Sequence, residues 1–381
     1  MRAWAILMML QGHFVDGLLD NAFRDNGNMV YSVWKYFRGI TAPVFFTVSG
    51  FIFTYLLVRS DKIGLANPRV RKGIRRGLQL IFIGYLLRMN LFGLLKGEVY
   101  DSFFLVDVLH CIGLSILGIL GVYLLTIRRG KLMFPLVLIG ITGMLFIFEP
   151  MYQRTDLHLL PHFIENYFSK ANGSVFTIFP WFGYATMGAF LSILFTRFKS
   201  YRYLYPVAIG IAMLLGTSLI FYSSDFFLSL SKLTGVQLFA DIFFNNYLFI
   251  RLGDVFLAFA FFMLIRSLLQ NETLLKIGQS TLSIYVIHFM ILYGSLTGIG
   301  LYRFFDHSLS PAIAIIGAVL FMAACSYAAL RYEKRKAYIK ENLALVTKIA
   351  LSRTEHFLVD AAEIIKSSYS RLLRLLGFVK G

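Results

Sequence analysis

The chain has 381 residues, of which 58% are hydrophobic, 17% aromatic and only 15% charged, and its mean hydropathy is +0.70. These values exclude an ordinary soluble domain, and the recurrence of long apolar runs predicts an all-α polytopic membrane protein. The net charge of +17 would suggest nucleic acid for a soluble protein. Here the basic residues cluster at the ends of apolar runs, so we expect membrane lipid as a partner and no nucleic acid.

Apolar runs of roughly 20 residues, the length that crosses a bilayer as a helix, recur throughout residues 1–330. They predict a transmembrane domain of about ten helices, separated by polar or basic connections. The predicted spans are residues 3–20, 39–58, 77–96, 105–127, 132–149, 176–196, 203–222, 246–268, 281–302 and 311–330.

The distribution of Lys and Arg predicts the orientation. Three connections that lie on one side of the predicted membrane are basic, so that side is expected to be cytoplasmic. An even number of spans then places both termini in the cytoplasm, and the longer connections 21–38, 150–175 and 223–245 on the opposite side. The basic residues are Arg59, Lys62, Arg69, Arg71, Lys72, Arg75, Arg76, Arg128, Arg129, Lys131, Arg197, Lys199 and Arg202.

Residues 331–381 form a predicted second region that is too polar to cross the bilayer. Leu, Ile and Val recur there at helical spacing between Lys and Arg. This pattern predicts a basic amphipathic cytoplasmic tail on the inner leaflet, where anionic lipid attracts basic residues. A solvated tail is the alternative.

The first span carries His13 and Asp16 inside an otherwise apolar run. Ionisable residues in a membrane helix usually face protein or a water-filled cavity and mark function. The i, i+3 spacing places both on one helix face, where a carboxylate would orient the imidazole and make it a better general base. The alternative is a structural pair that holds helices together.

The fourth span begins with the same arrangement, Asp107 and His110, close to the same outer boundary. Two such pairs at similar depth predict one polar cavity that opens outward. We expect other polar residues of the outer halves to bind substrate there, with the arginines offset by carboxylates or available to an anionic ligand. They are Arg38, Arg88, Arg251 and Asp254.

His288 in the ninth span is predicted to lie nearer the cytoplasmic half. A lone histidine in a membrane helix is often only a packing hydrogen bond, so its expected role is to line a route to the outer cavity. Cys111 and Cys325 lie in distant apolar runs, and we expect neither a disulfide nor a metal site.

Five motifs, found in order over residues 1 to about 290, resemble the transmembrane acyltransferases related to heparan-alpha-glucosaminide N-acetyltransferase, in their bacterial form. A looser similarity is to the acyltransferase 3 family. Relatives usually carry a polar N-terminal segment, with an acidic residue before the Arg that corresponds to Arg2. Contacts made by such a segment are not expected from this sequence. The motifs are RAWAILMMLQGHFVDGLL, TAPVFFTVSGF (41–51), DVLHCIGLS (107–115), FPWFGYATMGAF (179–190) and LSIYVIHF (282–289).

The resemblance implies transfer of an acyl group, usually acetyl, from cytoplasmic acyl-CoA to a hydroxyl or amine of a sugar or glycan on the far side, in a bacterial inner membrane. Acetyl-CoA is the implied co-substrate. Basic residues at the inner mouth would receive the CoA phosphates, although the positive-inside pattern explains them equally well. These residues are Arg71, Lys72, Arg75 and Arg76.

The expected mechanism has His13, oriented by Asp16, as the general base. Asp107 and His110 would bind the acceptor or share proton transfer, and Arg88 would steady the developing oxyanion. A covalent acetyl-histidine intermediate stays open, as does homo-oligomerisation. A proton-coupled transporter that uses the same His and Asp residues as a relay is the competing function, and a membrane scaffold working through the tail ranks third.

Overall fold

The computed structural model describes residues 1–97, 101–154 and 160–375. Within these residues every element of secondary structure is a helix, apart from two isolated β-bridges. The bridges pair Leu19 with Leu309 and Asn90 with Leu296. The chain forms two compact units, Met1–Tyr327 and a second that begins at Ala328. The predicted all-α class is confirmed.

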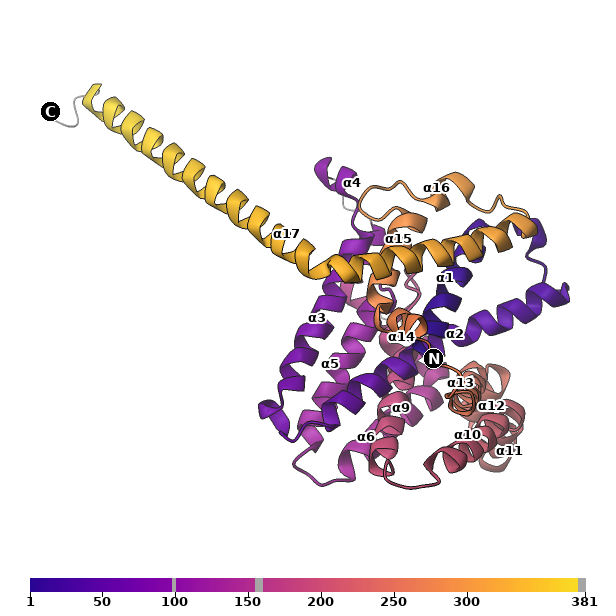
Figure 1. The fold of residues 1–381 in the computed structure, drawn as a ribbon. Helices are drawn as coiled ribbons and strands as arrows, with labels where there is room; N and C mark the ends of the chain where they lie inside the picture. The colour runs from indigo at the N-terminus through magenta and orange to yellow at the C-terminus, as the bar shows by residue number, and fades with distance from the viewer. Residues whose placement is uncertain (98–100, 155–159, 376–381) are drawn as a thin grey trace. The chain divides into compact units, whose positions relative to one another are not determined.

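The long helices lie where the apolar runs predict them (Figure 1). Short helices occupy parts of the connections between them. The long helices are α1 (Arg2–Leu18), α2 (Met29–Val58), α3 (Pro68–Arg88), α5 (Val108–Thr126), α6 (Met133–Ile147), α9 (Ile178–Arg197), α10 (Leu204–Phe221), α13 (Tyr247–Leu264), α15 (Thr281–Tyr293) and α17 (Pro311–Leu375). The short ones are η1 (Asn21–Phe23), η2 (Gly64–Ala66), α4 (Leu91–Leu95), η3 (Asp101–Phe104), α7 (Glu149–Arg154), α8 (His162–Glu165), α11 (Ser223–Thr234), α12 (Gln237–Phe244), α14 (Glu272–Gln279) and α16 (Leu301–Phe305).

Six helices of the described chain are long and apolar enough to cross a membrane, and a seventh span results if the bent pair α14 and α15 counts as one. The molecule is therefore an integral membrane protein by the character of its helices, whereas the predicted number of ten is not confirmed. Helices α1 and α6 have only 17 and 15 residues. Helix α3 begins with a run of Arg and Lys that lowers its hydropathy.

Several predicted boundaries are wrong. Helix α3 spans Pro68–Arg88 and not residues 77–96, and α17 continues past residue 330. At α2 and α15 the reason is local. Helix α2 starts at Met29 and not near residue 39, because the Asn28 side chain accepts the Val30 and Tyr31 N–H groups and caps the helix ten residues earlier. Helix α15 ends at Tyr293 and not near residue 302. Gly294 there adopts a left-handed conformation with φ of 70°, a common way for a helix to stop.

The two longest connections between the long helices also contain short helices. Residues 223–245 contain α11 and α12, and residues 150–175 contain α7 and α8. In Figure 1, α10 to α13 gather as one group, in agreement with the contacts of α10 with α13 and of α11 with α12. In α11 and α12 the apolar and the polar residues recur with the period of a helix. A connection that is long enough to hold a helix and has this period predicts a surface helix.

Helices α2 and α9 make the most extensive helix pair in the described chain, and glycine permits their close approach. A Cβ atom on Gly50 would collide with the Ala185 carbonyl oxygen, and one on Gly188 with the Thr47 carbonyl oxygen. Small residues at such crossings allow backbones to approach where lipid supplies no hydrophobic drive. This crossing fixes the depth of α2, which carries several cavity-lining residues.

Replacing Gly188 by Ala is expected to destabilise the protein by about 1 to 3 kcal/mol, the usual cost of an overpacked core site. The added methyl group must push the α2 backbone away. The measurement is the free energy of unfolding in detergent micelles. Gly140→Ala in α6 is the matched control, because no described atom lies within 4 Å of its added Cβ; equal effects of the two substitutions would contradict the role of the crossing.

Candidate active site

A cavity of about 300 Å³ lies among α1, α2, α5, α9, α13 and α15 and the connection that precedes α9. We call it the His13 cavity. Its wall combines polar and charged groups with aromatic rings, as small-molecule sites commonly do. Lining residues include His13, Arg38, Asp107, Lys170, Trp181, Tyr247 and Tyr285.

A second cavity, of about 200 Å³, adjoins the first. We call it the Arg76 cavity, because Arg76 and Arg2 line it together with an apolar wall that includes Leu80 and Ile112. Phe45 and Tyr285 line both cavities. Since Arg2 and His13 are 11 positions apart on α1, they lie about 16 Å apart along the helix axis, so the two cavities occupy successive levels of the bundle.

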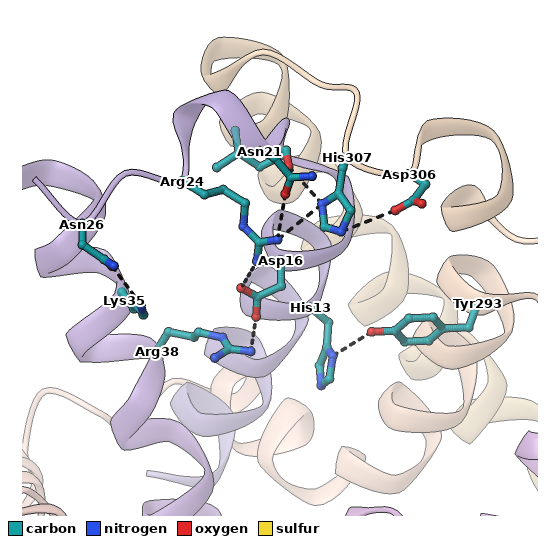
Figure 2. Close-up of polar contacts among 11 residues, drawn as sticks. His13, Asp16, Asn21, Arg24, Asn26, Lys35, Arg38, Tyr293, Asp306 and His307 are labelled. Carbon is teal, nitrogen blue, oxygen red and sulfur yellow. Dashed lines mark hydrogen bonds and ion pairs between the residues drawn. The ribbon is translucent and has the colours of Figure 1, made fainter. Parts of the chain in front are cut away.

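His13 is held by α15. Its Nδ1 atom lies 2.9 Å from the Tyr293 hydroxyl oxygen (Figure 2), and its ring centroid lies 5.4 Å from that of His288. The hydrogen bond fixes the ring and leaves Nε2 as the nitrogen that Tyr293 does not engage. The expectation that Asp16 orients His13 is therefore wrong in this structure, and Tyr293 occupies the orienting position.

Asp16 instead binds two arginines, as Figure 2 shows. One carboxylate oxygen pairs with Arg38, and the other lies 3.4 Å from Arg24 Nη2. Arg24 continues the cluster to His307, whose Nδ1 lies 3.4 Å from Arg24 Nη1. Guanidinium groups form stronger charge-assisted bonds with a carboxylate than a neutral imidazole does, so Asp16 holds Arg38 at the cavity.

Asp107 and His110 are engaged within their own helix end and with α3. Arg88 binds one Asp107 oxygen with both Nε, at 2.9 Å, and Nη2, at 2.8 Å, and its Nη1 donates to the Ser102 carbonyl oxygen. The His110 Nδ1 accepts the Asp107 backbone N–H at 3.0 Å. The predicted Asp107–His110 motif is thus a helix cap, and the Arg88 donors are committed to neighbouring groups.

His110 does not line either cavity. Its side chain is fully buried and packs where Gly84 of α3 leaves room, because a Cβ there would lie 2.6 Å from His110 Cε1. Its ring also makes an edge contact with Tyr85 at 4.3 Å. Nothing in this placement supports the expected proton transfer by His110, whereas Asp107 does reach the His13 cavity.

Arg251 and Asp254 form a brace between α13 and α2. Arg251 Nη1 lies 2.9 Å from Asp254 Oδ2, and the Tyr36 hydroxyl donates to Asp254 Oδ1 at 2.6 Å. The Arg251 guanidinium also lies over the Tyr36 ring, 4.5 Å from its centroid. These contacts satisfy both charged groups, and the expected direct contact with substrate is not supported, because neither residue lines a cavity.

His288 is more central than the sequence predicts. Its side chain is fully buried between His13 and Tyr285, whose ring centroid is 4.9 Å away. Tyr285 and Tyr293 were missed in the sequence. A signal for Tyr285 exists, since its i, i+3 relation to His288 places the two on one helix face.

Only one residue of the predicted basic set reaches a cavity. Arg76 lines the Arg76 cavity, whereas Arg71, Lys72 and Arg75 are exposed. Arg2 joins Arg76 there and donates to the Thr281 hydroxyl, although the sequence did not nominate it. The reason is the rotation of α3 about its own axis. Gly73 and Gly77 face α5, so this face of α3 is buried and the other basic side chains point outward.

Comparison with known proteins gives one match. A family model described as heparan-alpha-glucosaminide N-acetyltransferase, catalytic, matches residues 1–226. This range includes His13, Asp107 and the three cavity-lining arginines Arg2, Arg38 and Arg76, and it ends before α13 and α15. No curated protein and no solved structure was found to match the chain. The similarity to the acyltransferase 3 family stays a prediction.

Breaking the Arg88–Asp107 pair is expected to reveal strong coupling. The two side chains are 16% and 14% exposed, so water screens their attraction only weakly. A double-mutant cycle with Arg88→Gln and Asp107→Asn should therefore give an interaction free energy of about 1 to 3 kcal/mol. The measurement is unfolding in detergent. The exposed pair Lys276–Glu272 is the control and should couple much less; equal coupling would contradict the buried character of the first pair.

Proposed function

Since the chain belongs to the heparan-alpha-glucosaminide N-acetyltransferase family, we propose that it transfers an acetyl group from cytoplasmic acetyl-CoA to a hydroxyl or amine of a sugar on the opposite side of the membrane. The observation that carries this proposal is the meeting of two cavities at Phe45 and Tyr285. Arg2 and Arg76 line the Arg76 cavity, and His13 lines the other. A donor and an acceptor that arrive from opposite sides need such a meeting point.

The donor enters the Arg76 cavity. Arg2 and Arg76 suit the phosphate groups of CoA, because guanidinium groups bind phosphate through paired charge-assisted hydrogen bonds. The apolar wall suits the uncharged arm that carries the thioester. Arg71, Lys72 and Arg75 then act only through their charge near the entrance, which attracts an anionic donor.

The acceptor occupies the His13 cavity. In the tautomer that carries its proton on Nδ1, His13 donates to the Tyr293 hydroxyl. Its Nε2 then removes the proton of the acceptor hydroxyl or amine as that group attacks the thioester carbonyl. Arg38, held by Asp16, and Lys170 face the cavity and bind acceptor oxygens. Asp107, held by Arg88, completes the polar wall. His288 supports the His13 ring from the side of α15.

A proton-coupled transporter is not favoured. It would need His and Asp residues that relay protons to one another, whereas Asp16 and Asp107 are each paired with arginine. The family is that of an acetyltransferase catalytic region.

The remaining parts of the proposal concern location. The basic connections and both termini are placed in the cytoplasm, because Lys and Arg accumulate on that side of a membrane. The bacterial inner membrane is what the resemblance to the bacterial members of the family implies. The tail from residue 331 binds the anionic inner leaflet. Its last residues, 376–381, lie outside the described chain.

Removing the proposed base should abolish transfer without abolishing donor binding. His13→Ala is expected to lower kcat by about 10² to 10⁴-fold, the usual contribution of a general base. The measurement is transfer of labelled acetyl from acetyl-CoA to glucosamine and other sugar acceptors by protein in nanodiscs, beside equilibrium binding of acetyl-CoA. Transfer by the variant at the wild-type rate would reject His13 as the base, and absence of acetyl-CoA binding by the wild type would reject the proposed function.

Two neighbouring arginines of α3 offer a matched test of the donor site. Arg76→Gln is expected to raise the KM for acetyl-CoA about tenfold, the equivalent of roughly 1.4 kcal/mol, because it removes a charged contact inside the cavity. Arg75→Gln removes an equal charge from the exposed face of the same helix and should have little effect at physiological salt. Equal effects of the two substitutions would mean that only the surface charge of α3 matters.

A further inference from the structure

Tyr285 stands where the two cavities meet. Its side chain is only 3% exposed, yet it lines both the His13 cavity and the Arg76 cavity. Phe45 of α2 is the other residue that lines both, and its ring has no hydrogen-bonding group. Tyr285 therefore brings the polar group of this pair to the junction.

The Tyr285 hydroxyl makes no hydrogen bond within residues 1–97, 101–154 and 160–375. Buried tyrosine hydroxyls usually find a partner, and others in this bundle do. Tyr184 donates to the Leu248 carbonyl oxygen at 3.1 Å, and the Tyr123 hydroxyl accepts the Gly64 N–H at 3.2 Å. Because Tyr285 lines both cavities, its hydroxyl is available to a ligand.

The ring of Tyr285 is held in place by its own helix. It makes an edge contact with His288, with centroids 4.9 Å apart, and a stacked contact with Phe289 at 5.5 Å. His288 in turn contacts His13. The hydroxyl is thus fixed relative to the proposed base, and a fixed donor stabilises developing charge without having to reorganise during the reaction.

We infer that Tyr285 donates the hydrogen bond that stabilises the oxyanion formed on the thioester carbonyl, an inference that rests on the proposed acetyl transfer. Arg88, expected in this role from the sequence, is committed to Asp107 and to the Ser102 carbonyl oxygen. Tyr285 is the donor that both the thioester side and the acceptor side can reach.

The step balances as follows. The acceptor oxygen or nitrogen forms a bond to the carbonyl carbon, and its proton moves to His13 Nε2. The carbonyl π electrons move to the oxygen, where the Tyr285 hydroxyl donates to the negative charge. When the C=O bond reforms, the C–S bond breaks, and the departing CoA thiolate takes the proton from His13. The products are the acetylated acceptor and CoA with a free thiol.

The test is Tyr285→Phe, which removes the hydroxyl and keeps the ring. We expect kcat to fall by about 10² to 10³-fold, as when one oxyanion donor is lost, with little change in the binding of acetyl-CoA to protein in nanodiscs. Tyr55→Phe is the matched control, because Tyr55 lies on α2 and lines neither cavity. It should leave kcat unchanged.

A second variant separates chemistry from packing. Replacement of Tyr285 by 3-fluorotyrosine keeps both the ring and a hydroxyl donor. It should therefore keep kcat within about tenfold of the wild-type value, which corresponds to a change of about 1.4 kcal/mol in the activation free energy. An unchanged kcat for Tyr285→Phe, or a raised KM for acetyl-CoA with kcat unchanged, would overturn the inference and leave the proposed function intact. A wild-type protein that transfers acetyl to no acceptor would remove both.

Discussion

Three arginine–carboxylate ion pairs lie around the His13 cavity, and the rest of the site depends on this pairing. Arg38 binds Asp16, Arg88 binds Asp107, and Arg251 binds Asp254. An isolated charge inside a membrane bundle costs about 2.5 kcal/mol or more, so pairing these three arginines with carboxylates stabilises the bundle. Each of these pairs except the last joins two different helices, and the Tyr36 hydroxyl extends the last one to α2.

This pairing decides which groups are left for chemistry. The carboxylates are occupied by arginine, so they cannot orient or deprotonate a histidine. His13 is held by a neutral tyrosine, and the Tyr285 hydroxyl is unoccupied within the described chain. An imidazole that lines the His13 cavity and a phenol that lies where the two cavities meet suit acyl transfer better than long-range proton movement, since one can accept a proton while the other donates a hydrogen bond.

The site is assembled from both halves of the chain. His13, Arg38, Arg76 and Asp107 lie within the matched range 1–226, whereas Tyr285, His288 and Tyr293 come from α15, beyond it. Close crossings at glycine, such as that of α2 and α9, set the depth of the first group. The hydrogen bond between His13 Nδ1 and the Tyr293 hydroxyl then ties the second group to the first.

The sequence by itself determined the helical class, the approximate place of each long helix, the presence of His13 within a helical run and the acyltransferase resemblance, because hydropathy and local motifs are properties of contiguous residues. It did not determine partners. Asp16 at i+3 is the nearest candidate for His13 along the helix, yet Arg38, 22 positions further on, outcompetes the imidazole once α2 packs beside α1. Helix rotation likewise decided that Arg76 and not Arg75 reaches a cavity, and that Arg251 braces α2. Such choices depend on which faces of distant helices meet, and only the tertiary structure sets those faces.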